Sequence, residues 1–315
     1  MFRNIQNKNI ALIFGVIMIV ALVFTIKIIK NKISTPVIES ETDKKNLIVT
    51  SFYPLFFITS EIVGDRAEVY NVTPTGAEPH DYEPTTLDLT KIEKSKLLIL
   101  NGGKLEAWGK NIKNNLSDKN KIISLDENLI NNKIVSKDNI IRDPHIWLNP
   151  RLVKNEVEII LQSLSRMDPI NSTYYENNAK KLNNKLEELD NKFRLNLSRC
   201  IKKDIITAHN AFEYMTAEYG LKQVPISGMS PDEEPSPRQL AEVINYVKNN
   251  DIKYIFFESL VSPKLSDTIA KETGAKTLVL NPIEGLTDEE IANGKNYLTE
   301  MENNLNNLKI ALQCQ

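Results

Sequence analysis

Histidine and cysteine are scarce in this chain of 315 residues, which has three of the former and two of the latter. Neither cysteine belongs to a Cys-x-x-Cys pair, so the sequence offers no cysteine framework for a metal. Cys200 and Cys314 could form one disulfide bond in an oxidising compartment. An excess of basic residues is also absent, since 39 Lys and Arg residues stand against 41 Asp and Glu residues. We therefore expect no nucleic acid among the partners.

One long apolar run occupies residues 10–26, with basic residues on both sides. At about 17 residues, it lies at the short limit for a membrane-spanning helix. No small-residue cleavage site follows Phe24, which argues against removal of the segment as a signal peptide. We expect residues 1–30 to form a transmembrane anchor or an uncleaved signal, and residues 31–46 to form a polar tether.

Short apolar, β-branched runs alternate with helical patterns throughout the rest of the chain. The runs predict strands at 47–52, 67–72, 96–101, 121–125, 204–208, 223–226, 254–258 and 277–280. Helices are predicted between them at 54–63, 87–93, 105–116, 211–219, 237–248, 263–273 and 288–312. This alternation is typical of an α/β fold, and the length of the chain favours two lobes, each with a mainly parallel sheet flanked by helices.

A much longer helical stretch at residues 171–198 separates the two halves. Its apolar side chains recur at helical spacing among Lys, Glu and Asn residues, at Leu182, Leu186, Leu189, Phe193 and Leu197. A surface helix of one domain is one interpretation, and a rigid connector between lobes is the favoured one. The predicted division is a first lobe at 47–168, a linking helix at 169–199 and a second lobe at 200–315.

All three histidines lie in loops that follow predicted strands. His80 lies in a proline-bracketed loop, and His145 lies in the segment DPHIWLNP, where Pro144 and Pro150 favour an extended, ordered backbone. His209 directly follows the predicted strand 204–208. In open parallel sheets, ligands bind outside the carboxyl ends of the strands. Three histidines at such positions therefore predict a shared site.

A fourth donor is available in Glu284, which follows the strand 277–280. Three imidazoles and one carboxylate suit tetrahedral zinc, whereas manganese sites generally carry more oxygen donors. Asp143, Glu258 and Asp81 are candidates to fix the second ring nitrogen of a histidine. A zinc hydrolase is the rival hypothesis, but four protein ligands would leave no position for a catalytic water.

Three segments together resemble the ligand motifs of a known family. PHDYEP at 79–84, DPHIWLNP at 143–150 and TAHNAF at 207–212 are similar to motifs of the metal-specific solute-binding proteins of ABC importers, the cluster A-I family of zinc and manganese uptake. The resemblance implies two αβ lobes joined by a rigid helix, with one divalent ion in the cleft. It implies His80, His145 and His209 as ligands, and Glu284 as the carboxylate of the zinc-type branch.

The function implied by this resemblance is binding of extracytoplasmic Zn²⁺ and its delivery to a membrane permease with a cytoplasmic ATPase. The protein would be a monomer without enzymatic activity, anchored to the outer side of the cytoplasmic membrane. A manganese-binding member of the family, a zinc hydrolase and a surface adhesin are the alternatives. The sequence departs from the family pattern in lacking a histidine-rich loop at 127–142 and a cysteine for lipid attachment.

Overall fold

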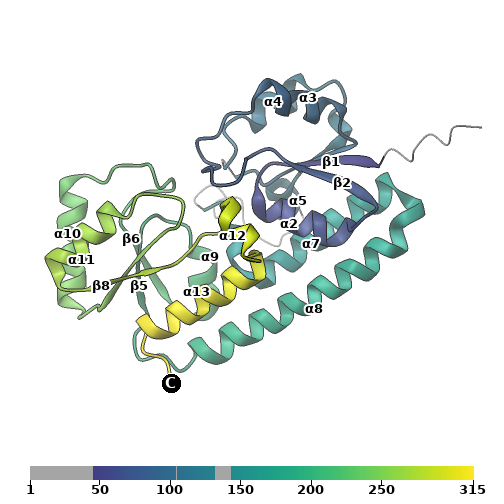
Figure 1. The fold of residues 1–315 in the computed structure, drawn as a ribbon. Coiled ribbons are helices and arrows are strands. Elements are labelled where there is room, and N and C mark those ends of the chain that lie inside the picture. Colours follow the sequence, from purple (N-terminus) through teal and green to yellow (C-terminus); the bar gives the residue numbers. More distant parts are fainter. Residues whose placement is uncertain (1–44, 104, 132–142) are drawn as a thin grey trace, which may run out of the picture. The chain divides into compact units, whose positions relative to one another are not determined.

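The computed structural model describes residues 45–103, 105–131 and 143–315. The membrane segment at 10–26 and nearly all of the expected tether lie outside the described residues. Within these ranges, none of the helices is both long enough and apolar enough to cross a membrane. The α/β prediction is confirmed, because the structure contains two parallel sheets of four strands, each flanked by helices (Figure 1).

The first sheet has the strand order β2-β1-β3-β4, and all its pairs are parallel. Its strands are β1 (Asn46–Thr50), β2 (Ala67–Asn71), β3 (Leu97–Leu100) and β4 (Ile122–Ser124). Alternate side chains enter different cores: Val49 and Leu98 pack in the core beneath α3 (Thr86–Lys94) and α4 (Gly109–Asn115). Ile48 and Ile99 join the larger core with α2 (Tyr53–Val63), α5 (Leu125–Asn131) and α7 (Pro150–Met167). Both faces of the sheet are therefore buried, as parallel sheets require.

The second sheet repeats the arrangement with the order β6-β5-β7-β8. Its strands are β5 (Asp204–Thr207), β6 (Lys222–Pro225), β7 (Tyr254–Phe257) and β8 (Lys276–Val279). α10 (Pro237–Asn249) and α11 (Lys264–Thr273) cover one face, and α9 (Glu213–Tyr219) and α13 (Tyr297–Ala311) contribute to the core on the other. In both sheets the strand order reverses beside the first strand. The crevice at the carboxyl ends of the strands lies at that point.

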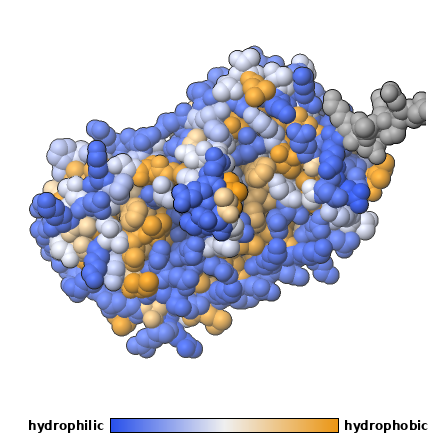
Figure 2. Space-filling view, in the orientation of Figure 1, coloured by the Kyte–Doolittle hydropathy of each residue, from blue (hydrophilic) through white to orange (hydrophobic). Residues whose placement is uncertain are grey.

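The long helix α8 (Ser172–Leu197) follows α7 and the short 3₁₀ turn η3 (Pro169–Asn171). Its 26 residues correspond to about 39 Å at 1.5 Å per residue. The stripe from Leu182 to Leu197 is buried in a core that also contains Phe52 of the first half and Tyr297 of the second. Hydrophilic residues cover its outer face (Figure 2). The helix thus packs against both halves, although the division at 168/169 and 199/200 stays a prediction.

Two predicted helices were wrong in extent. The first was expected from residue 105 but begins at Gly109, because Glu106 turns inward and accepts hydrogen bonds from the backbone N–H groups of Asn101 and Gly102 (2.7 and 2.9 Å). The second was expected to run through 288–312 but is divided into α12 (Asp288–Ala292) and α13. Gly294 adopts a φ of 79° there, and Asn296 caps α13 by accepting from two backbone N–H groups.

A disulfide bond joins Cys200 to Cys314. It connects the chain just after α8 to the chain just after α13, across a sequence separation of 114 residues. The sequence alone did not decide whether these two cysteines are bonded. In the structure it ties the C-terminus to the end of the long helix.

Candidate metal centre

His80 lies in the loop between β2 and α3, which is fastened to the first lobe by Asp88. The carboxylate of Asp88 accepts hydrogen bonds from the hydroxyl groups of Tyr70 (2.6 Å) and Tyr82 (2.8 Å), as well as from Thr85. Tyr82 is two residues beyond His80, so its hydrogen bond fixes the end of the segment that carries the ring. The side chain of His80 is only 6% exposed.

His145 precedes the 3₁₀ turn η2 (Ile146–Leu148), in which every side chain is buried. Asp143 accepts from the backbone N–H of His145 (2.9 Å) and lies 2.6 Å from its Nδ1. The other carboxylate oxygen of Asp143 accepts from the backbone N–H of Glu213, in the second half of the chain. Asn149 ends the segment by capping α7. The prediction of an extended backbone between the two prolines was wrong at 146–148, where the chain forms this 3₁₀ turn.

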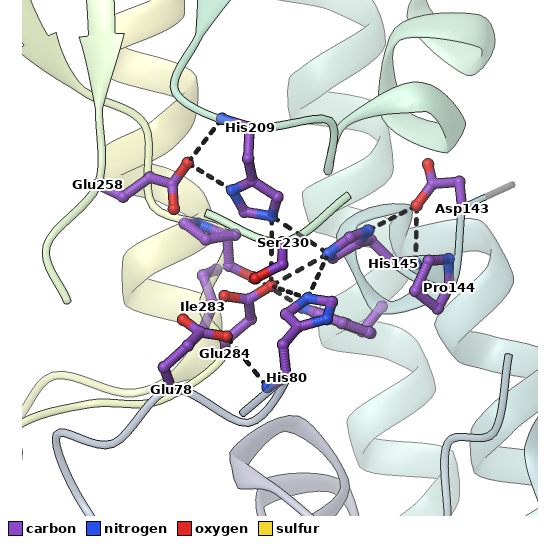
Figure 3. A network of polar contacts seen from close by, with 12 residues as sticks. Glu78, His80, Asp143, Pro144, His145, His209, Ser230, Glu258, Ile283 and Glu284 are labelled. Atoms are coloured by element: carbon purple, nitrogen blue, oxygen red, sulfur yellow. Dashed lines mark hydrogen bonds and ion pairs between the residues drawn. The ribbon is translucent and has the colours of Figure 1, made fainter. Parts of the chain in front are cut away.

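His209 and Glu284 come from the second lobe. His209 follows β5, and its Nδ1 lies 2.6 Å from Oε1 of Glu258, which directly follows β7. Gln223 donates a hydrogen bond to the backbone carbonyl of His209 (2.9 Å) and so fixes the main chain there. Glu284 follows β8 and is 1% exposed. Figure 3 shows the three rings and the Glu284 carboxylate pointing toward one another.

The four donor atoms form a compact group, all within 4.8 Å of one another. Nε2 of His145 lies 3.2 Å from Nε2 of His80, 3.3 Å from Nε2 of His209 and 3.1 Å from Oε1 of Glu284. The same Glu284 oxygen lies 3.3 Å from His80 and 3.5 Å from His209. Zinc–ligand distances of about 2.0 to 2.2 Å give a tetrahedron with edges of about 3.3 to 3.6 Å. The spacing therefore suits a four-coordinate ion of this size.

The centre also favours positive charge. Burial acts to lower the pKa of His145 and of His209. Asp143 beside His145 and Glu258 beside His209, each together with Glu284, outweigh burial. The pKa of both rings is therefore raised, that of His209 most strongly. Burial likewise opposes ionisation of Glu284, but contacts with the three histidines hold its pKa well below the usual value. If the neutral rings of His145 and His209 donate Nδ1–H to Asp143 and Glu258, their Nε2 lone pairs face each other, and a cation between them removes the repulsion.

Two of the three predicted supporting carboxylates lie against a ring nitrogen, namely Asp143 and Glu258. The third, Asp81, has its carboxyl group beside that of Asp232, a contact that raises the pKa of Asp232. Sequence reasoning missed Glu78, whose Oε1 accepts from the backbone N–H of His80 (3.3 Å). Burial and the nearby Glu284 carboxylate raise the pKa of Glu78 to about 10. Its place two residues before His80, between Ala77 and Pro79, was the available signal.

Comparisons with known proteins agree with this centre. Residues 48–311 match the family model of the periplasmic component A of zinc-uptake complexes. The chain is 38% identical over 286 residues to the high-affinity zinc uptake system protein ZnuA of Bacillus subtilis, covering 87% of this chain and 89% of that protein. It is also 38% identical to the zinc-binding lipoprotein AdcA of Streptococcus pneumoniae, covering 86% of this chain but 56% of that longer protein.

A similar fold is found in the Zn(II)-bound ZnuA-like domain of AdcA from Streptococcus pneumoniae, whose crystal structure is known. It superimposes with a TM-score of 0.75 at 40% sequence identity, over 85% of this chain and 99% of that domain. The similarity spans both lobes and the helix that joins them.

Proposed function

Since the chain belongs to the family of the periplasmic component A of zinc-uptake complexes, we propose that it binds Zn²⁺ outside the cytoplasm and delivers it to the permease of an ABC importer. The observation that carries the proposal is the convergence of three imidazole nitrogens and one carboxylate oxygen at the spacing of a tetrahedral site. His80, His145, His209 and Glu284 are the ligands in this proposal. Their donor set favours zinc over manganese.

The centre is suited to binding rather than to catalysis. The family consists of solute-binding proteins for zinc uptake and not of enzymes. A hydrolytic zinc site keeps an open position for water, whereas four protein donors fill a tetrahedron. We therefore propose that the protein has no enzymatic activity. A zinc-bound water with Glu284 turned away would support the hydrolase alternative instead.

Delivery requires the ion to leave a buried centre that lies between two lobes. Because α8 packs against α2 and α7 of the first half and α13 of the second, a wide hinge opening would disrupt a shared core. We therefore propose that the ligand loops move while the lobes stay nearly fixed. We also propose that the protein works as a monomer and that residues 10–26 hold it at the membrane. Scattering profiles with and without zinc should then be almost superimposable.

Zinc titration of the purified full chain against a chelating indicator tests the function. We expect one Zn²⁺ per chain with sub-micromolar affinity, and loss of that affinity in His145→Ala. Glu302→Gln is the control, because this partly exposed carboxylate on α13 pairs with Lys192, away from the centre. Binding weaker than micromolar, or unchanged affinity in His145→Ala, would contradict the proposal.

A further inference from the structure

The residue before Glu284 has an unusual backbone conformation. Ile283 has a φ of 57° and is fully buried. Left-handed backbone is uncommon in residues other than glycine, and in a β-branched residue it is an outlier. Such a conformation persists only where the surroundings impose it. The turn at Ile283 therefore needs a source of constraint.

Asn281 supplies part of this constraint from within the same loop. Its Oδ1 accepts a hydrogen bond from the backbone N–H of Ile283 (2.8 Å), closing a tight turn. Trp147 of the first lobe donates from Nε1 to the backbone carbonyl of Pro282 (2.7 Å). The single peptide group that joins Pro282 to Ile283 is thus held through both its C=O and its N–H, and Glu284 follows one residue later.

Asn281 is itself held by Asn304, which lies on α13. Oδ1 of Asn304 accepts from the backbone N–H of Asn281 (2.8 Å), and its Nδ2 donates to the backbone carbonyl of Asn281 (2.6 Å). Both side chains are nearly fully buried, at 1% exposure each. The side-chain amide of Asn304 thus bonds both the backbone N–H and the backbone C=O of Asn281, as a residue of a neighbouring strand would. It fixes the chain at the point where it leaves β8.

We propose that Asn304 is a positioning residue of the metal centre, which aims the Glu284 carboxylate at the three histidines through Asn281 and the left-handed turn at Ile283. The inference rests on the proposed function, because it explains how one ligand of that centre is oriented. Asn304 touches neither the ligands' donor atoms nor the place of the ion. Its effect on the metal must therefore pass through the backbone of the loop.

The test uses Asn304→Leu, which removes both hydrogen bonds while keeping the number and branching of the side-chain heavy atoms, and Asn307→Leu as its matched control. Asn307 lies one turn further along α13 and also donates from Nδ2 to a backbone carbonyl, that of Val279 at the end of β8 (2.8 Å). Both variants lose a contact between α13 and the same strand region. Only Asn304 contacts the loop that leads to Glu284.

Co²⁺ serves as the spectroscopic probe, because its visible absorption is much stronger in a four-coordinate tetrahedral site than in sites of higher coordination. Asn304→Leu should reduce this absorption and weaken zinc binding by about 10- to 100-fold, the usual effect of losing a group that orients a ligand. Asn307→Leu should keep the wild-type spectrum and affinity. If Asn304→Leu does not fold, Asn304→Ser replaces it, with the same expectation.

A rescue experiment separates positioning from simple loss of packing. Glycine adopts left-handed backbone freely, so Ile283→Gly combined with Asn304→Leu should recover part of the cobalt absorption that Asn304→Leu loses. Equal spectra and affinities for Asn304→Leu and Asn307→Leu would overturn the inference while leaving zinc binding intact. A wild-type chain without affinity for Co²⁺ or Zn²⁺ would instead overturn the proposed function, and this inference with it.

Discussion

The indole Nε1 of Trp147 donates a hydrogen bond to the backbone carbonyl of Pro282 across 2.7 Å. Trp147 is two residues from His145, and Pro282 is two residues from Glu284, so this bond joins ligand loops from the two lobes. The backbone carbonyl of Trp147 also accepts from the hydroxyl of Tyr297 (2.5 Å). Trp147 therefore helps to fix the relative position of two proposed ligands through its side chain and its main chain.

Trp147→Phe should destabilise the protein and weaken zinc binding, because the Pro282 carbonyl is left buried without its donor. An unsatisfied buried group costs about 1 to 3 kcal/mol. Trp108→Phe is the control, since Trp108 is also buried and its Nε1 has no hydrogen-bond partner within the described ranges. Urea unfolding and zinc competition measure both effects. Equal losses in the two variants would mean that only aromatic volume matters.

Glu258→Gln should lower zinc affinity by about 10- to 100-fold, as is typical when the carboxylate behind a ligand histidine is changed. The amide oxygen can still accept a hydrogen bond from Nδ1 of His209, but it lacks the negative charge that makes the ring a stronger ligand for the metal. Asp168→Asn is the control, because Asp168 is a buried carboxylate that accepts from Tyr175 and Asn171, away from the centre. That variant should lose stability and keep its zinc affinity.

Zinc binding should release protons at neutral pH. The pKa of His145 and that of His209 lie above the usual value in the metal-free protein, so these rings keep their protons to a higher pH than a free imidazole does, and Zn²⁺ must displace those protons. Affinity should therefore fall as pH falls. Calorimetry in buffers of different ionisation enthalpy counts the released protons. Proton release that is unaffected by Glu258→Gln would contradict this account, because that carboxylate raises the pKa of His209.

Much of the fold follows from local pattern, and so does the grouping of the four candidate ligands. Histidine is rare in the chain, and the strand-end loops of two parallel sheets meet at one crevice. Other features depend on contacts between distant residues. The left-handed backbone at Ile283 is held through Trp147 and Asn304, and nothing in the sequence around 283 predicts it. Glu106 turns inward for the same kind of reason, because it accepts a hydrogen bond from the distant hydroxyl of Ser51 (2.5 Å) as well as from the backbone at 101 and 102.

The carboxyl group of Glu156 should make stability depend on pH. It is fully buried on α7, neither oxygen has a hydrogen-bond partner in the described part of the chain, and burial raises its pKa to about 8. An unfolded glutamate has a pKa of about 4.3, so between these values the folded state binds the extra proton. Its contribution to stability is therefore complete below about pH 4.3 and is lost as the pH rises toward 8.

Glu156→Gln should remove this dependence, because the amide does not ionise. Urea unfolding at pH 5 and pH 8 should show a smaller decline in the free energy of unfolding for Glu156→Gln than for the wild type. Glu158→Gln, an exposed position on the same helix, should decline as the wild type does. Parallel pH profiles for all three proteins would show that Glu156 finds a partner when it ionises.

Ile283 offers a direct test of backbone strain. Ile283→Ala and Ile283→Gly remove nearly the same buried side chain, but only alanine must adopt a left-handed conformation that costs an L-residue about 1 to 2 kcal/mol. We expect the glycine variant to be at least as stable as the alanine variant in urea unfolding. At Ile255, an equally buried isoleucine in β7, the order should be reversed, because glycine weakens a strand relative to alanine. If the alanine variant is the more stable one at both positions, the turn relaxes once the isoleucine is gone, and packing of the Ile283 side chain alone imposes the left-handed geometry.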